Sequence, residues 1–467
     1  MQPEHAECSD RFKASEEQCR KLSNWKKDWK VHLMNIRTSQ QYPFTAGSLL
    51  IAAILLGLLG GGWAGPAYAE VEGDRYRTGE LVVKLDPTSD ATIDEINATY
   101  GTTTLKTLLG SAEIYLVRLP SGTDPEATAE SMSGDPRLLY AEPNFIGAPP
   151  EGGGSYRAWA EPTTTSSSDQ YAVDALNLSC AQSVTLGEGT TIAVLDTGAQ
   201  LDHPALEASL TTGKERYDFV DDDPNPADDP NGLDDDADGV IDEMVGHGTH
   251  VAGIVDLVAP EARIMPLRIL DSEGHGDVFA AAEAISFASR KGADVLNLSF
   301  GTQDRSKLLD DVIGRAAKEG VVTVAAAGNL NTDVPQYPAA AEDAGTLAVT
   351  SVGPDDVKSD FANFGGWVDV AAPGEGIHSA FPTSAYASAT GTSMATPFVA
   401  GQAALIKSVA PSLGIESVEG QITKTARSLD ASNPAYAGKL GAGLPDIGAS
   451  VECSGGGGTT EGGSEAE

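Results

Sequence analysis

The chain has 467 residues, of which 30 are Lys or Arg and 68 are Asp or Glu, so its formal net charge is −38. Its hydrophobic fraction of 41% is that of a globular protein with a sizeable core, and its length allows two or three domains. The deficit of basic residues argues against a nucleic-acid partner, because phosphate binding needs a surplus of Lys and Arg. Such acidity is typical of a protein adapted to salt and also of a secreted calcium-binding protein, and composition leaves both open.

Residues 1–69 carry the features of an export signal. Residues 49–59 are an apolar run too short to span a bilayer comfortably, and residues 67–69 (Ala-Tyr-Ala) follow as a small-x-small cleavage pattern. Because the stretch before the run is long and polar, Met34 is a candidate for the true start, with Arg37 on its basic side. The segment predicts a secreted, extracellular protein with no stable membrane anchor after cleavage; an uncleaved anchor is the alternative.

Cleavage after Ala69 would leave two cysteines. It would remove Cys8 and Cys19, so that only Cys180 and Cys453 reach an oxidising compartment. The chain-entropy model assigns roughly 5 kcal/mol to a bridge that closes so long a loop, where native geometry allows closure. The sequence leaves open whether the two form a disulfide or stay as free thiols.

Residues 70–148 predict a small α+β domain. Their hydrophobic pattern gives the order strand, helix, strand, strand, helix, strand, which is the ferredoxin-like split βαβ arrangement. The predicted elements are strand 81–85, helix 91–100, strand 102–108, strand 114–119, a helix from Asp124 and strand 138–141.

Residues 149–169 form a predicted linker, and residues 453–467 a predicted tail. The linker is rich in Pro, Gly, Ser and Thr, so we expect it to be exposed, with a maturation cut in it or just before it. The tail is glycine-rich and acidic, a composition typical of disorder.

Between the linker and the tail, residues 170–452 alternate short apolar runs with helical patterns. Such alternation predicts an α/β fold in which a mostly parallel sheet has helices on both faces. The predicted strands are 192–195, 264–267, 295–300, 321–326, 347–352 and 368–371, with helices at 277–290 and 306–319. In open α/β sheets the active site lies beyond the carboxyl ends of the strands, and Asp196 stands where the first strand ends.

Three motifs supply the residue types of a nucleophilic triad. A serine hydroxyl is a weak nucleophile at neutral pH, so it needs a histidine to take its proton and a carboxylate to orient that histidine. The order Asp before His before Ser is that of the subtilisin arrangement. The motifs are Asp196-Thr197-Gly198, His247-Gly248-Thr249-His250 and Gly391-Thr392-Ser393-Met394-Ala395-Thr396-Pro397.

On these motifs the chain resembles the subtilisin-like serine proteases, or subtilases, over residues 168–449. The resemblance implies that Ser393 is the nucleophile, that His247 is the general base and that Asp196 orients His247 and stabilises its charged form. It implies the subtilisin-like fold for this part of the chain.

The small N-terminal domain shares in the resemblance. Its ending, residues 140–145 (Tyr-Ala-Glu-Pro-Asn-Phe), is similar to that of the inhibitor propeptides of subtilases. This implies a folding chaperone and inhibitor that is later cut away; a permanent small domain is the alternative.

The resemblance also assigns residues around the substrate. Ser393 opens a helical stretch, so its N–H is an expected donor to developing negative charge, and Asn329 matches the oxyanion asparagine of the family. Two further segments match the strand edge that pairs with the substrate backbone and the facing wall of the first specificity pocket. A wall of alanine and glycine predicts a roomy pocket that accepts large apolar or aromatic side chains. The residues are Ser299, Phe300 and Gly301 in the first segment and Ala326, Ala327 and Gly328 in the second.

The segment 218–243 holds twelve acidic residues and no basic ones, which is more than a solvated face needs. Its alternate aspartates before a turn glycine are the pattern of a calcium loop, although Val245 stands where an EF-hand has its glutamate. Subtilases commonly bind calcium for stability, so we predict a structural Ca²⁺ here, with an acidic loop without metal as the alternative. The predicted ligands are Asp234, Asp236, Asp238, Asp242 and Glu243.

The sequence therefore predicts a secreted serine endopeptidase that works through an acyl-enzyme and is made as a self-inhibited zymogen. Its partners would be protein or peptide substrates and its own propeptide, and the mature form is expected to be a monomer. The main alternative is a catalytically inactive subtilase fold that serves as an extracellular binding module.

Other enzyme classes agree less well with these motifs. An esterase or lipase would carry Gly-x-Ser-x-Gly, and Ala395 departs from that pattern. An aspartic protease would need a second Asp-Thr-Gly beside that of Asp196. A zinc site at His247 and His250 would lack the glutamate of the metalloprotease motif, so His250 is predicted to be structural.

Overall fold

The computed structural model describes residues 75–151, 170–235, 238–341 and 345–453. The predicted signal segment 1–69 with Met34, most of the linker, Asp236 and the glycine-rich part of the tail lie outside these ranges. Among the described helices, none combines the length and the hydropathy that a bilayer span requires.

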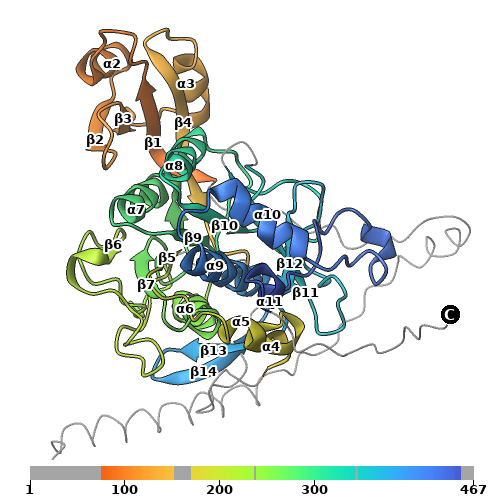
Figure 1. Ribbon diagram of the computed structural model, residues 1–467. Helices are drawn as coiled ribbons and strands as arrows, with labels where there is room; N and C mark the ends of the chain where they lie inside the picture. Colours follow the sequence, from red (N-terminus) through yellow and green to blue (C-terminus); the bar gives the residue numbers. More distant parts are fainter. Residues whose placement is uncertain (1–74, 152–169, 236–237, 342–344, 454–467) are drawn as a thin grey trace, which may run out of the picture. The chain divides into compact units, whose positions relative to one another are not determined.

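The N-terminal region forms an antiparallel sheet with two helices on one face (Figure 1). Its strands lie in the order β2-β3-β1-β4, which confirms the predicted ferredoxin-like arrangement. Helix α2 begins with a reciprocal capping box between Thr92 and Glu95, and α3 begins with Asp124 as its N-cap. The elements are β1 Tyr76–Leu85, α2 Ile93–Tyr100, β2 Thr103–Thr107, β3 Ile114–Arg118, α3 Pro125–Met132 and β4 Leu138–Gly147.

The two faces of this sheet pack against different partners, as the alternation of side chains along β1 requires. Leu81 and Val83 face the small domain's own core, together with Ile96 of α2 and Met132 of α3. Val82 belongs instead to a core shared with helices of the large region. The N-terminal sheet is therefore sandwiched between its own helices and those of the large region.

The large region contains a seven-stranded sheet with the order β12-β11-β10-β9-β5-β7-β6. Every pairing within it is parallel. All six predicted strands are present, although β9 ends before Ser299, and the two-residue β6 adds an edge that was not predicted. The strands are β5 Thr191–Asp196, β6 Tyr217–Asp218, β7 Arg263–Arg268, β9 Val295–Leu298, β10 Val322–Ala326, β11 Thr346–Val352 and β12 Val370–Pro373.

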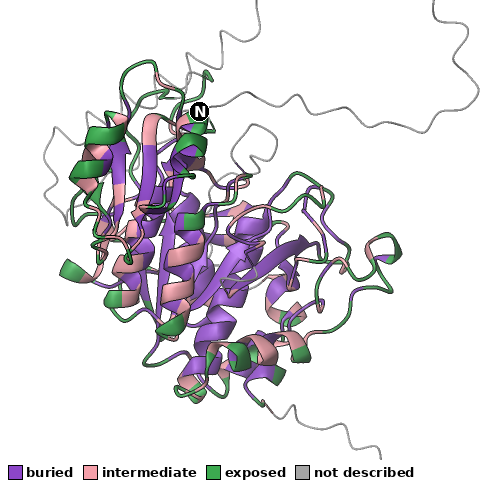
Figure 2. Cartoon of the chain, turned by 90° about the horizontal axis from the view of Figure 1, so that it is seen from above, coloured by how far each residue is buried: buried purple, intermediate pink, exposed green. Residues whose placement is uncertain are grey.

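Helices cover both faces of this sheet, as predicted. Ile192 and Val194 of β5 share a core with α6 (His247–Val258) and α9 (Thr392–Val409). Ala193 and Leu195 of the same strand point the other way, into the core shared with α7 (Val278–Arg290) and α8 (Lys307–Lys318). Figure 2 shows that most residues of the sheet and of its central helices are buried.

A disulfide joins Cys180 and Cys453, which are separated by 273 residues in the sequence. Their Cα atoms are 5.9 Å apart. The bridge that the sequence left open is therefore formed. It ties α5 to the chain just beyond α11. The remaining elements are α4 Tyr171–Ala175, α5 Leu178–Gln182, η1 Gly213–Glu215, β8 Gly276–Asp277, β13 Ile377–Phe381, β14 Ala385–Ala389, α10 Ile415–Thr425, η3 Pro434–Tyr436 and α11 Ile447–Ser450.

Candidate active site

The fold brings the three motif residues to the carboxyl end of the parallel sheet. Asp196 is the last residue of β5, His247 is the first residue of α6, and Ser393 lies in the first turn of α9. Gly248 has to be glycine, because a Cβ there would overlap the backbone of Gly198 in the loop after β5. This close approach seats the start of α6 directly against the aspartate.

Asp196 and His247 form a buried pair. His247 Nδ1 donates to Asp196 Oδ1 at 2.7 Å, and the same oxygen accepts the backbone N–H of Thr197 at 2.8 Å. Burial would lower the pKa of His247, but the charges and hydrogen bonds of Asp196 and of Glu151 outweigh it and raise that pKa to about 10. With Glu151 in place, His247 is an imidazolium held between two carboxylates.

A second buried carboxylate, Asp228, links the two motif segments. Asp228 Oδ1 accepts Thr197 Oγ1 at 3.1 Å and the Gly246 N–H at 2.9 Å. Its Oδ2 accepts the N–H of Thr249 at 3.1 Å and the hydroxyl of Thr249 at 2.6 Å. Asp228 thus connects Thr197, the neighbour of Asp196, to Gly246 and Thr249, which stand before and after His247 in the chain. Sequence reasoning counted it only as one of twelve acidic residues.

Two donors converge on one point beside Ser393. The Ser393 N–H lies 3.3 Å from Glu151 Oε1, and Asn329 Nδ2 donates to the same oxygen at 3.0 Å. Asn329 Oδ1 accepts the N–H of Thr392 at 3.1 Å and its hydroxyl at 2.9 Å, which aims the amide nitrogen at that point. Glu151 Oε1 stands where the oxyanion of a tetrahedral intermediate would stand.

The other carboxylate oxygen of Glu151 occupies the path of the proton. Ser393 Oγ donates to Glu151 Oε2 at 2.6 Å, and His247 Nε2 lies 3.2 Å from it. Burial would raise the pKa of Glu151, but hydrogen bonding to His247, the charge of His247 and hydrogen bonds from Ser393 and Asn329 hold it below its ordinary value. Sequence reasoning missed this residue; its signal was an acidic side chain directly after Pro149-Pro150, at the end of the small domain.

The predicted substrate edge is occupied by the chain itself. The N–H of Ala148 donates to Gly301 O at 3.1 Å, and the N–H of Gly301 donates to Ala148 O at 2.9 Å. Ser299 is buried and donates its hydroxyl to Ser393 O at 3.0 Å, and Phe300 packs on Gly147. Of this run, Gly301 makes the backbone pairing, while Ser299 and Phe300 support the site from behind.

A polar side chain lies against the predicted pocket wall. Ala326 ends β10, the Ala327 N–H donates to Val349 O at 2.9 Å, and the Gly328 N–H donates to Thr392 Oγ1 at 3.1 Å. A Cβ on Gly328 would collide with the side chain of Gln336. This glutamine, which the sequence analysis did not consider, places a polar amide against the alanine and glycine wall.

His250 lies in the interior, as predicted. Its Nε2 lies 3.0 Å from Ile377 O and 3.1 Å from Ala387 O. Burial and the nearby charge of His247 lower its pKa to about 3, so it is neutral. It fastens α6 to the β13-β14 hairpin and takes no part in the arrangement around Ser393.

The acidic loop uses its carboxylates on its own backbone. Asp242 accepts the N–H groups of Asn231 and Gly232, Asp234 accepts that of Gly239, and Asp238 accepts that of Val240. Glu243 neighbours Asp242, and the N–H groups of both point toward Glu273. No three His, Cys, Asp or Glu side chains of the described residues come together as a metal site, and Asp236 is not among those residues. These contacts do not by themselves fit a bound calcium.

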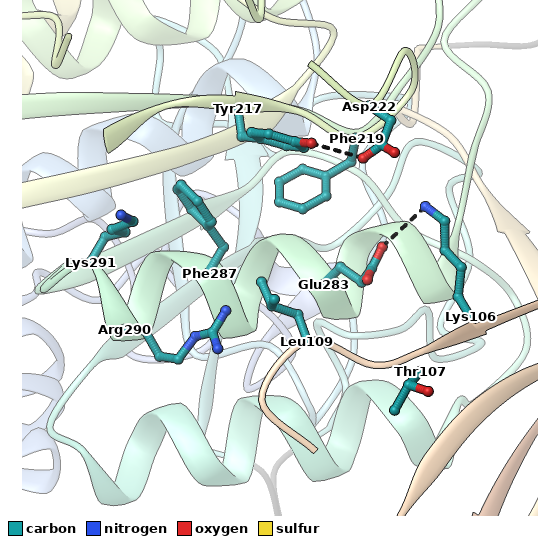
Figure 3. Close-up of a pocket in the computed structure, with 10 residues that line it drawn as sticks. All are labelled: Lys106, Thr107, Leu109, Tyr217, Phe219, Asp222, Glu283, Phe287, Arg290 and Lys291. Carbon is teal, nitrogen blue, oxygen red and sulfur yellow. Dashed lines mark hydrogen bonds and ion pairs between the residues drawn. The ribbon is translucent and has the colours of Figure 1, made fainter. Parts of the chain in front are cut away.

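A cavity lined by residues other than those of the candidate site is drawn in Figure 3. It measures about 670 Å³ and opens between the N-terminal sheet and α7. Lys106 from the small domain forms an ion pair with Glu283 in its wall, at 3.6 Å. Its lining includes none of the predicted site residues.

Comparison with known proteins gives consistent results over both regions. The model described as the subtilase family, peptidase S8, matches residues 187–443, and that described as the fervidolysin N-terminal prodomain matches residues 64–144. Thermitase of Thermoactinomyces vulgaris is 41% identical over 252 residues, which are 52% of this chain and 83% of thermitase. A thermophilic serine proteinase of Bacillus sp. strain AK1 is 37% identical over 294 residues, or 61% of this chain and 66% of that protein.

A solved structure shows a similar fold over most of the chain. Fervidolysin of Fervidobacterium pennivorans, a keratinolytic enzyme related to subtilisin, superposes with a TM-score of 0.64 at 23% identity. The match covers 85% of this chain and 64% of fervidolysin. At this identity the likeness concerns the fold.

Proposed function

Since this chain belongs to the subtilase family of subtilisin-like serine proteases, we propose that Asp196, His247 and Ser393 form its catalytic triad. The enzyme would hydrolyse peptide bonds in proteins or peptides through a covalent acyl-enzyme. The observation that carries this proposal is the convergence of Ser393 N and Asn329 Nδ2 on a single oxygen of Glu151. Donors fixed on one point beside a serine hydroxyl are what an oxyanion requires.

The proposed reaction follows from these positions once the cleft holds a substrate. Ser393 Oγ attacks the peptide carbonyl carbon while His247 Nε2 takes the hydroxyl proton, and the negative oxygen is bound by Ser393 N and Asn329 Nδ2. The intermediate collapses as His247 gives its proton to the leaving amine, which breaks the C–N bond. Water then attacks the acyl-enzyme with His247 again as base, and the acid is released with Ser393 restored.

A fluorophosphonate probe tests this proposal directly. We expect the mature protein to be labelled covalently and the Ser393→Ala variant to stay unlabelled, with Ser388→Ala, in strand β14 of the same chain, labelled as the wild type is. Failure of correctly matured protein to react would favour the inactive binding module. Labelling that survives in Ser393→Ala would place the nucleophile elsewhere.

We further propose that residues 70–148 act as an inhibitory propeptide of a secreted zymogen, with the signal in residues 1–69 and the cut at or near the linker 149–169. The backbone pairing of Ala148 with Gly301 supports this, because it lays the end of the small domain in the substrate cleft. The disulfide between Cys180 and Cys453 is consistent with export to an oxidising compartment. Detection of a chain that begins after the linker in culture medium would test both points.

The two rival functions explain less of the geometry. A binding module with a subtilase fold has no need of a buried Asp196–His247 pair or of an aimed Asn329 amide. An esterase would not use the strand edge at Gly301, whose hydrogen bonds suit an extended peptide. Calcium at the loop that includes Asp234 and Asp238 stays a prediction from the sequence.

A further inference from the structure

We propose that the side chain of Glu151 is a built-in carboxylate inhibitor, which keeps the uncut chain inactive by filling the oxyanion site and lying between Ser393 and His247. The inference rests on the proposed function, since it assigns a role to the group that lies on the proposed catalytic residues. It differs from simple blockage of the cleft by a backbone, because one side chain makes the decisive contacts.

Four contacts hold the carboxylate. Oε1 receives Asn329 Nδ2 at 3.0 Å and Ser393 N at 3.3 Å, while Oε2 receives Ser393 Oγ at 2.6 Å and lies 3.2 Å from His247 Nε2. The side chain is 7% exposed, and its carboxylate lies so close to Gly391 that any Cβ there would overlap it. Each donor that the proposed reaction needs is therefore engaged by one group.

The chain reaches this position as a bound peptide would. Gly147 of β4 pairs with Gly276 of β8, and Ala148 exchanges two backbone hydrogen bonds with Gly301. Pro149 and Pro150 follow, and they fix φ and narrow the conformations of the chain just before Glu151. The segment thus delivers the glutamate to the site in a restrained form, which lowers the entropy lost when the carboxylate binds.

The arrangement resembles a product complex and not a substrate complex. Peptide hydrolysis creates a carboxylate beside the serine, and the Glu151 side chain supplies such a group without any cleavage. The carbon of an ionised carboxylate is a poor electrophile, and Ser393 Oγ donates its proton to Oε2 instead of attacking. The donors at Asn329 and Ser393 are taken by the side chain, so a peptide carbonyl cannot use them at the same time.

The Glu151 carboxylate, which we call the plug, also prevents His247 from acting as a base. His247 faces Asp196 from β5 and Glu151 from the entering segment, with His250 one turn further along α6, and its pKa is raised to about 10. A charged His247 cannot accept the proton of Ser393. The raised pKa means that His247 stabilises the plug fully below its ordinary 6.5 and loses this effect as the pH rises toward 10. Glu151, whose pKa is lowered, contributes above its ordinary 4.5 and loses its contribution as the pH falls through the lowered value.

The first test compares precursors in which only the plug is changed. We would label uncut full-length chains of the wild type, Glu151→Gln and Glu151→Ala with a fluorophosphonate probe, and follow precursor and mature bands separately. Because hydrogen bonds to charged groups are among the strong ones, we expect both variant precursors to react about 10-fold faster or more than the wild-type precursor. Glu130→Gln, at an exposed position of helix α3, is the matched control and should react like the wild type.

The mature band separates this inference from the proposed function. Mature protein from every variant should be labelled at one rate, since Glu151 is expected to have left the cleft. Equal labelling of all four precursors, fast or slow, would overturn the plug while mature protein still reacts. Absence of label in all mature bands would instead contradict the proposed triad.

A second measurement is needed if the variant precursors digest themselves before they can be labelled. In the Ser393→Ala background the chain cannot be cut by its own triad, and the midpoint of His247 titration is followed by NMR of its imidazole nitrogens. Removing an opposite charge at this distance should lower the midpoint in Glu151→Gln by about one pH unit or more. The same midpoint with and without Glu151 would show that the carboxylate does not lie on His247, and the inference would fail.

Discussion

At the residue scale, the amide of Asn329 is fixed before any substrate arrives. Thr392 donates to Asn329 Oδ1 through both its N–H and its hydroxyl, so the amide N–H groups face the proposed oxyanion position without reorganisation. Preorganised donors of this kind stabilise charge that appears only in the transition state, and they therefore act on kcat more than on KM.

We predict that Asn329→Ala lowers kcat of the mature enzyme by about 10²–10³-fold with little change in KM. Asn329→Asp, which keeps the shape but replaces the amide donor with a carboxylate, should lose at least as much, and exposed Asn225→Ala should lose nothing. Steady-state kinetics on a peptide substrate measures all three. An equal rise in KM with kcat unchanged would indicate that Asn329 binds the substrate and not the oxyanion.

Residues inside compact motifs could be predicted from the sequence, and residues that act through long-range contacts could not. Asp196, His247 and Ser393 each sit in a short run of diagnostic neighbours, and the structure brings them together. Glu151 meets Ser393 across 242 positions, so no local pattern links the two. Gln336 was missed for the same reason, because its contact with Gly328 depends on how a loop folds back.

At the scale of elements, strand β4 of the N-terminal region supplies hydrogen-bond acceptors to the first N–H groups of two helices in the large region, in addition to the helices' own N-caps Asp277 and Ser306. Glu142 accepts Ser306 Oγ at 2.7 Å, the Lys307 N–H at 2.8 Å and the Leu308 N–H at 3.1 Å, all at the start of α8. Asn144 Oδ1 accepts the Phe279 N–H at 3.1 Å, at the start of α7. A carboxylate at a helix N-terminus satisfies N–H groups without internal partners and also interacts favourably with the helix dipole.

We predict that Glu142→Ala lowers the free energy of unfolding of a Ser393→Ala precursor by about 1–3 kcal/mol, since buried N–H groups of α8 lose their acceptor. Urea unfolding measures the loss, and Glu130→Ala, at an exposed position of α3, is the matched control. Hydrogen exchange localises it, because the amides of Lys307 and Leu308 should exchange faster. Unchanged exchange at these two amides would contradict the capping role even if overall stability fell.

The periodicity of the sequence predicted most elements, and its failures have a common cause. Strands such as β5 and β11 are buried on every residue, so their apolar runs are continuous and easily recognised. Strand β6 has only two residues, which is too short for any period to register. The predicted strand 295–300 was too long, because β9 ends at Leu298. Phe300 is apolar because its side chain packs against Gly147, and not because its backbone belongs to the sheet.

At the scale of the whole molecule, several basic residues of the N-terminal region form ion pairs with carboxylates of the large region. Lys84 lies 2.5 Å from Asp311, Arg77 lies 3.3 Å from Asp277, and Arg75 pairs with Asp304. In a chain with a net charge of −38, such pairs offset repulsion locally and orient the small domain on α7 and α8. Because these groups are partly exposed, salt would screen the pairs, and the caps and the shared core carry more of the association.

The same excess of negative charge favours cation binding at the acidic segment 218–243. Asp221, Asp222 and Asp223 follow β6 closely, and further aspartates crowd the loop that precedes α6. A bound Ca²⁺ would relieve their repulsion and add a ligand that binds only the folded chain, which stabilises that state by mass action. Because the described carboxylates accept hydrogen bonds from their own backbone, a calcium ion would compete with these bonds.

We predict that chelation lowers the melting temperature of the Ser393→Ala chain by about 3–5 °C relative to saturating calcium, as about 2.7 kcal/mol of ligand linkage implies for a folded region of this size. A double Asp234→Asn, Asp236→Asn variant should lose this calcium-dependent increment, because it removes two of the predicted ligand charges. Exposed Asp229→Asn, which lies just before the loop, should retain it. Differential scanning calorimetry with calcium and with a chelator gives the comparison. Equal melting temperatures in the two buffers would mean that the loop is held by its own hydrogen bonds alone.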